Sequence, residues 1–396
     1  MTSSQAVFPR RATCALTCLA LFALTVLTGC GGGEDTAAER RAAIVNTLGV
    51  RLRSLAEEHP EMPGIVVHVL DERSGLSWAG STGVADRATL RPLTPNATFR
   101  TASVTKVFTA ATILRLQARG DLAATDAIER HLSPQTLALL RAGGYDTGRI
   151  TVHHLLTHRS GLPDHALSVP YLNAVLADPT HRWTRSEQLA LAMSLGVPLF
   201  APGRDYRYSD TGYLLLGEMI ERRTGQALGP AFRQLLQLAS LGLASTHQES
   251  IEPIPAGAGP RAKQDLIEGI DDSMVDASAD LWGAGGLVSD ARDLALFVRE
   301  LVQGRVLGAT LSQAMLTVAT EIPGTVPASA YARGIARVRI DGSTCWGHDA
   351  FSGAFTLHCP DLGVTVAGSI NATELVGAPG SMAVAVDLVR TISSIE

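Results

Sequence analysis

Residues with high strand propensity lie at both ends of this 396-residue chain, on either side of a long stretch of helical periodicity. Near the N-terminus, runs 65–70 and 76–79 are joined by a short polar segment ending in Gly75, a pattern that predicts a β-hairpin. An isolated hairpin is at best marginally stable in water, so this pair needs further strands beside it. The remaining β-prone runs lie near the C-terminus, at 331–340, 344–348, 353–358 and 364–370. The pattern therefore predicts one mixed antiparallel sheet built from both termini.

Helical segments are expected to flank and interrupt this sheet. The first, 37–59, has a row of apolar residues on one face: Ile44, Leu48, Leu52 and Leu55. Residues 382–392 predict a closing helix, and most segments from about 104 to 301 have helical periodicity with Pro- and Gly-rich loops between them. We therefore expect an α/β (α+β) fold, with a mostly helical subdomain, about 104–301, inserted into one domain spanning 37–396.

Composition and charge exclude some classes of protein. Hydrophobic side chains make up 46% of the residues, enough for a sizeable folded core. The 33 Lys and Arg residues stand against 38 Asp and Glu, a net charge of −5 without long blocks of one sign. Such a pattern offers no basic surface for a polyanion, so we expect no nucleic acid partner.

The N-terminus resembles a bacterial export signal. Arg10 and Arg11 precede an uncharged run, rich in Leu and Ala, in which Leu27-Thr-Gly-Cys30 resembles a lipobox. We expect residues 1–29 to be a signal peptide, Cys30 to be lipidated, and 30–36 to include a flexible glycine linker. The protein would then be anchored to the membrane through Cys30 in the bacterial cell envelope, facing the periplasm or the cell exterior. A retained membrane helix is the alternative, because the apolar run just reaches spanning length.

Two cysteines, Cys345 and Cys359, would remain beyond the lipid anchor, because Cys14 and Cys18 would leave with the signal peptide. They would lie in a compartment where disulfides persist. If their strands form a hairpin centred on Ser352, each cysteine lies 7 residues from the centre and the two face each other. A cross-strand disulfide is then geometrically possible, and two buried free thiols are the alternative.

Ser103 and Lys106 lie three residues apart at the expected start of a helix. At this spacing the two side chains share one face, so the amine can reach the hydroxyl. The helix N-terminus disfavours the lysine cation and so favours the form of the amine that accepts a proton. The pair is a candidate nucleophile and base, although Ser-x-x-Lys alone also fits a cap serine beside a solvated lysine.

Four further blocks make the pattern specific. They are ITVHHLLTHRSGLP at 150–163, APGRDYRYSDTGYLLLG at 201–217, AGGLVSDARDL at 284–294 and WGHDAFSGAF at 346–355. Together with Ser103-Val-Thr-Lys106, and over nearly all of the expected mature chain, they resemble the serine β-lactamase and penicillin-binding-protein superfamily, specifically its class C β-lactamase, DD-peptidase and carboxylesterase branch. The resemblance implies the fold of that superfamily and a serine hydrolase that works through an acyl-enzyme.

The resemblance also implies roles for particular residues. Ser103 would be the acylated nucleophile, Lys106 its proton partner, and Tyr208 the group that carries protons between Ser103 and the leaving group. His348 falls where the superfamily has a Lys-Thr-Gly or His-x-Gly motif, and would contact substrate. The oxyanion hole would consist of the backbone N–H groups of Ser103 and Phe351.

Two positions depart from the superfamily pattern. Ala350 replaces the motif glycine, so its N–H remains an alternative to that of Phe351 in the oxyanion hole. Asp210 replaces the more usual asparagine at a substrate-binding position, and it cannot donate a hydrogen bond to an acylamido carbonyl. Beside Lys106 it would favour the lysine cation and leave more of the proton-accepting role to Tyr208.

The sequence gives less support to other kinds of functional site. His153, His154 and His158 include an i, i+4 pair, but the His-Glu-x-x-His order of zinc hydrolases is absent, so we expect no metal and no cofactor. The sequence has no Gly-x-Ser-x-Gly, which argues against an α/β-hydrolase. A catalytically silent, lipid-anchored binding module with the same fold is the alternative from a different class.

The expected function is that of a D-alanyl-D-alanine carboxypeptidase-like or esterase-like hydrolase, with a class C-type β-lactamase as the alternative. Its substrate would be a small molecule or a peptidoglycan peptide, and we expect a monomer. His348 and Asp210 argue against an efficient β-lactamase. A mostly neutral histidine holds a β-lactam carboxylate less firmly than a lysine would.

Overall fold

The computed structural model describes residues 32–267, 269–323 and 329–395, with side chains from Thr36 onward. The expected signal peptide, residues 1–29, and the expected lipidation site Cys30 lie outside the described residues. Within the described part, none of the helices combines the length and the apolar character needed to cross a membrane.

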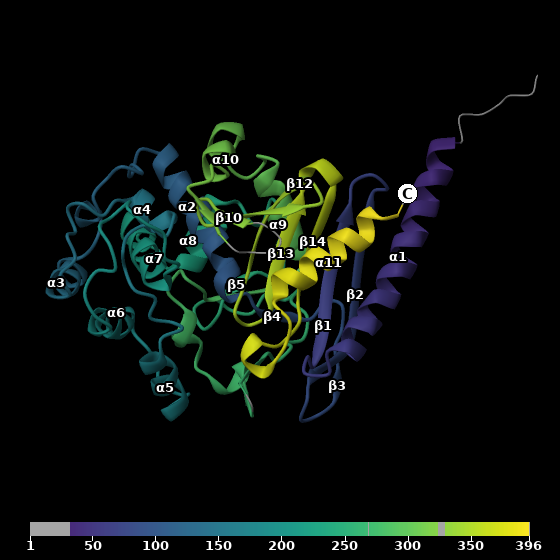
Figure 1. Cartoon of the computed structure of the whole chain (residues 1–396), viewed down its shortest axis with the longest axis horizontal. Coiled ribbons are helices and arrows are strands. Elements are labelled where there is room, and N and C mark those ends of the chain that lie inside the picture. The colour runs from purple at the N-terminus through teal and green to yellow at the C-terminus, as the bar shows by residue number, and fades with distance from the viewer. Residues whose placement is uncertain (1–31, 268, 324–328, 396) are drawn as a thin grey trace, which may run out of the picture.

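An antiparallel sheet of nine strands in the described residues dominates the fold (Figure 1). β1 (Gly64–Asp71) hydrogen-bonds to β2 (Leu76–Asp86) on one side and to β14 (Val364–Ser369), near the C-terminus, on the other. Beyond β14 the order is β13 (Ala354–Cys359), β12 (Ser343–Asp349), β11 (Ala336–Ile340), β10 (Ser329–Tyr331) and β9 (Thr320–Ile322), while β3 (Arg91–Pro92) lies outside β2. The predicted sheet built from both termini is therefore confirmed.

Helices α1 (Gly32–Glu58) and α11 (Ser381–Ser393) lie along one face of the sheet (Figure 1). Alternate residues of β1 are buried with these helices: Ile65, Val67 and Val69. The apolar face predicted for the first helix is confirmed, since its four residues are at most 3% exposed. However, α1 begins at Gly32, so residues 32–36, expected as linker, are helical. Extending an existing helix costs little per residue, which allows this first segment to include Gly32 and Gly33.

Helix α9 (Ala291–Val302) covers the opposite face, where it contacts β1, β13 and β14. α2 (Thr105–Ala118) is joined to α9 through the rings of Phe108 and Phe297, which stack with centroids 3.7 Å apart. α9 belongs with the sheet, because its apolar side chains share one core with Val66 and Leu70 of β1.

The run 331–340, predicted as one strand, forms two. β10 ends at Tyr331 and β11 begins at Ala336. Between them Gly334 has a φ of +72°, and the Ala332 N–H donates to the Ile335 carbonyl at 2.9 Å. Glycine adopts a positive φ without the steric cost that other residues incur. One glycine thus divides a long β-prone run with a tight turn.

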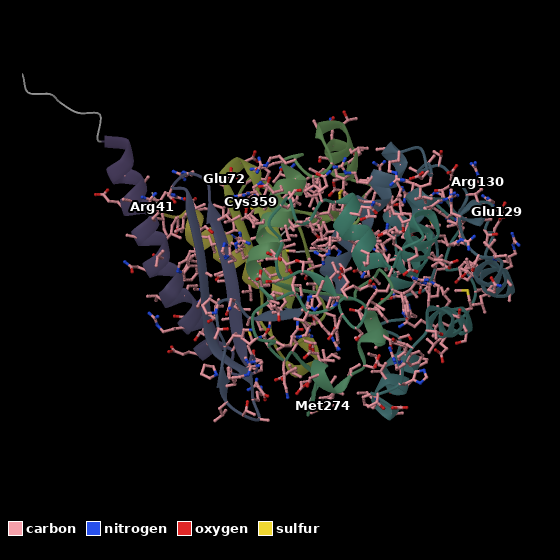
Figure 2. The ribbon with its side chains drawn as sticks, turned by 180° about the vertical axis from the view of Figure 1, so that it is seen from behind. Arg41, Glu72, Glu129, Arg130, Met274 and Cys359 are labelled. Carbon is pink, nitrogen blue, oxygen red and sulfur yellow. A yellow bond between two sulfur atoms is a disulfide. The ribbon has the colours of Figure 1, made fainter. Side chains whose placement is uncertain are left out.

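The region between the two groups of strands is mostly helical and forms the far side of the molecule (Figure 1). Its helices are α3 (Pro134–Ala142), α4 (Val152–Leu156), α5 (Val169–Ala177), α6 (Arg185–Ser194), α7 (Asp210–Thr224) and α8 (Leu228–Leu235), and α10 (Ala309–Met315) follows α9. Two small sheets consist of β4 (Thr98–Arg100), β8 (Leu287–Asp290) and β5 (His247–Gln248), and of β6 (Asp265–Ile267) and β7 (Ile270–Asp271). Arg41 of α1 and Arg130, before α3, lie near opposite ends of the molecule (Figure 2).

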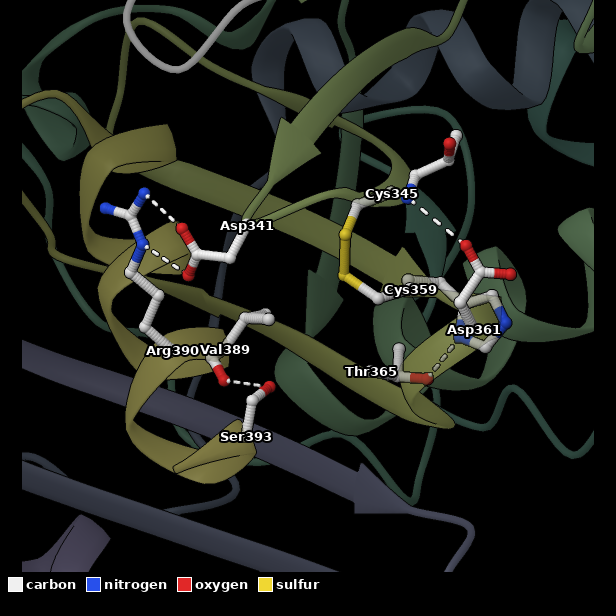
Figure 3. The surroundings of a disulfide bond; sticks show 10 residues. Asp341, Cys345, Cys359, Asp361, Thr365, Val389, Arg390 and Ser393 are labelled. Carbon is white, nitrogen blue, oxygen red and sulfur yellow. Dashed lines mark hydrogen bonds and ion pairs between the residues drawn. A yellow bond between two sulfur atoms is a disulfide. The ribbon is translucent and has the colours of Figure 1, made fainter. Parts of the chain in front are cut away.

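Cys345 and Cys359 form a disulfide between β12 and β13 (Figure 3). The register pairs Trp346 with His358, so the two cysteines are the next residues opposite each other. Both are fully buried. The bond joins the two strands on either side of the turn that carries Phe351, and therefore braces one wall of the candidate site.

Candidate active site

A short turn before α2 places Ser103. This turn, η1 (Ala102–Val104), leads directly into the helix, and Ala102 has a φ of +38°, which is sterically unfavourable for a residue with a Cβ. Thr101 fixes the entry by donating from its N–H and its hydroxyl to the Leu287 carbonyl of β8, at 2.9 and 3.1 Å. The position of the serine hydroxyl is therefore set by β8 as well as by its own helix.

Two cavities meet at Ser103. One, of about 420 Å³, is also lined by Tyr208, His348 and Phe351. The other, of about 160 Å³, is lined by carboxylates and apolar side chains, among them Asp164, Asp210, Asp280, Leu172 and Val175. The serine thus has space on either side, as a nucleophile needs for the two parts of a substrate.

The Lys106 side chain is completely buried and makes three polar contacts. Its Nζ lies 2.9 Å from Ser103 Oγ, 3.0 Å from the Ala284 carbonyl and 2.7 Å from Asp210 Oδ1. The contacts with Ser103 and Ala284 are hydrogen bonds, and the contact with Asp210 is an ion pair. The Ser-x-x-Lys motif predicted the contact with Ser103. The 284–294 block contributes the carbonyl of Ala284, which accepts a hydrogen bond from the lysine.

Tyr208 lies over the same lysine, whose Nζ is 5.0 Å from the centre of its ring. Burial raises the pKa of the Tyr208 phenol well above its usual value, and the Asp210 carboxylate raises it further, against the lowering effect of a hydrogen bond with Ser103. Tyr208 is therefore a neutral phenol at rest. This result opposes our expectation that Asp210 shifts the proton-accepting role toward Tyr208: the carboxylate that pairs with Lys106 also disfavours a phenolate beside it.

Two carboxylates that sequence reasoning missed lie beside Asp210. Asp164 Oδ1 accepts the N–H of Asp210 at 3.1 Å. Burial raises the pKa of Asp164 to about 7, and the Asp210 charge adds to the rise. Burial and Asp210 likewise raise the pKa of Asp280 to about 7. Asp164 directly follows the 150–163 block, which was the one indication in the sequence that it lies near the site. No spacing rule connects Asp164, Asp210 and Asp280, because they are far apart in the sequence.

His348 is buried on β12 with both ring nitrogens engaged. Its Nδ1 donates to the Asp349 carbonyl at 2.7 Å, and its Nε2 accepts from the Tyr331 hydroxyl at 3.0 Å. Burial, and after it the Lys106 charge, lower the pKa of His348 to about 4. The imidazole is therefore neutral at pH 7. Tyr331 was not identified from the sequence, because it lies outside the quoted blocks.

The turn after His348 distinguishes the two candidate oxyanion donors. The Ala350 N–H donates to the Ala354 carbonyl at 2.8 Å, and the Gly353 N–H donates to the Ala350 carbonyl at 2.9 Å. The Ala350 N–H is thus used within the turn. This favours the Phe351 N–H as the partner of the Ser103 N–H, and Phe351 lines the cavity at Ser103.

The three clustered histidines do not share a site. His154 Nδ1 accepts the Thr151 N–H in a helix capping box, and His158 Nδ1 accepts the Ser209 N–H at 3.1 Å. His153 Nδ1 lies 3.5 Å from Arg333 Nε. Among the described residues, the structure brings together no group of His, Cys, Asp and Glu that could hold a metal ion.

Comparison with known proteins assigns the family. Residues 52–390, most of the chain, match the family model described as Beta-lactamase. The chain belongs to the beta-lactamase family. Within this beta-lactamase family it is 31% identical over 183 residues to penicillin-binding protein 4* of Bacillus subtilis, and 35% identical over 192 residues to esterase EstB of Burkholderia gladioli. These matches cover 46% and 47% of this chain but only 36% and 47% of the two relatives, so the chain spans less than half of each.

Solved structures of two other proteins share the fold. A D-stereospecific amidohydrolase from Streptomyces has a TM-score of 0.70 and 28% identity, covering 82% of this chain and 94% of that one. A D-amino acid amidase from Ochrobactrum anthropi SV3 has a TM-score of 0.72 and 24% identity, covering 88% of this chain and 98% of that one, and shows the fold alone. The predicted fold and superfamily are confirmed, and the family and these neighbours support a hydrolase.

Asp210 is expected to disfavour substrates that need an amide donor at its position. We predict that Asp210→Asn raises kcat/KM for nitrocefin relative to p-nitrophenyl acetate by roughly 10- to 100-fold, because the new N–H can bind an acylamido carbonyl that simple esters lack. Steady-state kinetics with both substrates on both proteins measures the ratio. Asp276→Asn is a matched control, since Asp276 lines the same cavity but accepts from Ser278. An unchanged ratio would mean that Asp210 does not determine specificity.

Asp280 is expected to make stability depend on pH. Its pKa of about 7 in the fold lies above the ordinary value of 3.8, so the native state holds a proton that the unfolded state has lost between these pH values. The free energy of unfolding should therefore fall as pH rises from about 4 to 7. Asp280→Asn removes this loss, and we expect a clearly larger Tm gain at pH 8 than at pH 5, at roughly 2–4 °C per kcal/mol. Equal gains in thermal melts at both pH values would contradict the argument.

Proposed function

We propose that this chain hydrolyses small esters and peptides, through an acyl-enzyme on Ser103, in the manner of a D-alanyl-D-alanine carboxypeptidase or an esterase. The observation that carries the proposal is the 2.9 Å contact between Ser103 Oγ and the Nζ of Lys106, a lysine that is fully buried. A solvated lysine beside a cap serine, the ordinary explanation of a Ser-x-x-Lys sequence, would leave the amine in water. Here the amine has no exposure and faces the hydroxyl.

The ion pair of Lys106 and Asp210 supplies a route for the serine proton. When Ser103 Oγ attacks a carbonyl carbon, Lys106 passes one proton to Asp210 Oδ1, 2.7 Å away, and accepts the serine proton in its place. The N–H groups of Ser103 and Phe351 stabilise the negative oxygen of the tetrahedral intermediate. Tyr208, which is neutral at rest, donates its phenolic proton to the leaving group and recovers one from Lys106. Water then hydrolyses the acyl-enzyme by the reverse proton transfers.

The charges around Ser103 favour some acyl donors over others. Neutral His348 offers no cation for the carboxylate of a β-lactam, and Asp210 meets an acylamido carbonyl with an acceptor. A class C-type β-lactamase is therefore the less favoured reading. A specific alternative is cleavage next to an N-terminal D-residue, because Asp164 and Asp280 face the smaller cavity and can hold a substrate ammonium group. A D-aminopeptidase from Brucella anthropi, 29% identical over 184 residues, is among the relatives.

The nucleophile can be tested with a panel of substrates. We expect Ser103→Ala to abolish hydrolysis of p-nitrophenyl esters, of an acyl-D-Ala-D-Ala peptide and of D-alanine p-nitroanilide, together with covalent labelling by a fluorophosphonate. Lys106→Ala should lower kcat by about 1,000-fold or more while substrate still binds. Lys263→Ala is the matched control, because Lys263 is the only other lysine and pairs with Asp86 and Asp271. Wild-type protein that neither turns over nor is labelled would instead support a silent binding module.

We also propose that the protein is a lipoprotein of the bacterial cell envelope, held at the membrane through Cys30. The Leu27-Thr-Gly-Cys30 sequence after an apolar run supports this proposal. Cells expressing the full chain should incorporate labelled palmitate into it, and Cys30→Ala should lose the label and leave the membrane fraction. Retention of both in the variant would contradict lipidation at this cysteine.

A further inference from the structure

His158 is attached to the polypeptide on both sides of Tyr208. Its backbone carbonyl accepts the N–H of Arg207 at 2.9 Å, and its ring Nδ1 accepts the N–H of Ser209 at 3.1 Å. The next residue, Asp210, donates its N–H to Asp164 at 3.1 Å. The segment that presents Tyr208 to Ser103 is irregular backbone before α7, so these bonds replace the ladder that a strand would supply.

The His158 ring also packs against Tyr208 itself. Its centroid lies 4.3 Å from that of Tyr208, 5.1 Å from that of Tyr213 and 4.7 Å from that of Tyr331. The residue is 1% exposed. Tyr331 in turn donates a hydrogen bond to His348. The His158 ring therefore contacts both Tyr208, beside Ser103, and Tyr331, which orients His348. Aromatic groups packed in this way have few alternative orientations.

The backbone of His158 adopts a conformation that is unfavourable for a residue with a Cβ. The residue follows the C-cap Thr157 of α4 with a φ of +55°, a left-handed position where glycine is the usual choice. Any residue with a Cβ is less stable than glycine there. A histidine held in an unfavourable conformation beside a reactive centre points to a function for its side chain.

His158 does not exchange protons in this arrangement. Because Nδ1 accepts from Ser209, the ring proton of the neutral imidazole is on Nε2. Burial, together with the charge of Lys106, holds the pKa of His158 well below its ordinary value. The imidazole is therefore neutral while the enzyme works, and its contribution must come from position.

We propose that His158 is a positioning residue for general-acid catalysis by Tyr208: it holds the phenol in line with the leaving group through its bond to Ser209 and its ring contact. The inference rests on the proposed function, in which Tyr208 protonates the leaving group. It concerns the step in which the bond from the acyl carbon to the leaving group breaks and the Tyr208 proton moves to the departing atom.

The dependence on leaving group tests this proposal. p-Nitrophenolate departs without a proton, whereas an alkoxide must be protonated as it leaves. Variants that misplace Tyr208 should therefore lose more activity on an ethyl ester than on the p-nitrophenyl ester of the same acid. For His158→Gly, which suits the positive φ and keeps the backbone bond to Arg207, we expect kcat/KM to fall about 10- to 100-fold further on the ethyl ester. His158→Asn, which tolerates the same φ and keeps a short acceptor, should show a smaller difference.

A matched control separates positioning from loss of fold. His154→Ala weakens the same helix, where His154 completes the capping box, and should lower both ester activities by one common factor. The proposal is overturned if both His158 variants lose the two activities equally, or lose neither. If His158→Gly does not fold, His158→Asn decides alone. Absence of a Ser103 acyl adduct in the mass of wild-type protein would refute the proposed function instead, independently of any result with His158.

Discussion

A fully buried lysine is the constraint on which the site depends. Removing an ammonium group from water costs several kcal/mol unless partners replace its hydration, and Lys106 finds them in Ser103, Asp210 and Ala284. These partners come from the turn before α2, the start of α7 and the loop before β8. Satisfying one cation therefore brings three segments, distant in sequence, to one point. The serine is exposed to the cavity at that same point.

The charge of this lysine also governs its neighbours. Near one ammonium group the structure places Asp210, Asp164 and Asp280. Burial raises the pKa values of Asp164 and Asp280 to about 7, and the charge of Asp210 adds to both rises. Tyr208 and His348 both remain neutral for related reasons. The site thus contains several titratable side chains that are neutral at rest. A negatively charged substrate group would find no free cation to pair with among these side chains, whereas a positively charged group could pair with a carboxylate.

The sequence predicted features that follow from local pattern. β-Prone runs bounded by turn residues located β1 and β14, and period-3.6 hydrophobicity located the buried face of α1. The Ser-x-x-Lys spacing located the contact between Ser103 and Lys106. The features that the sequence did not predict are determined by tertiary structure. Gly334 ended a strand through a backbone conformation, and Asp164, Asp280 and Tyr331 enter the site only because separate loops converge there. His158 lies in a quoted block, where it was weighed only as a metal ligand, a role that the sequence did not favour. Its bond to Ser209 spans 51 residues, so no local pattern could indicate that contact.

The pairing of β1 with β14 has a consequence for the order in which the protein can be made and folded. About 290 residues separate Asp71 from its partner Val364, so β1 waits for nearly the whole chain before its second neighbour exists. At 5–20 residues per second, a ribosome takes roughly 15–60 s to cover that distance. During this time one edge of the hairpin is open to any other strand, and long-range pairing of this kind is slow to form. The sheet therefore cannot be completed until synthesis is nearly finished. Until then, the open edge of β1 can pair with a strand of another chain unless something covers it.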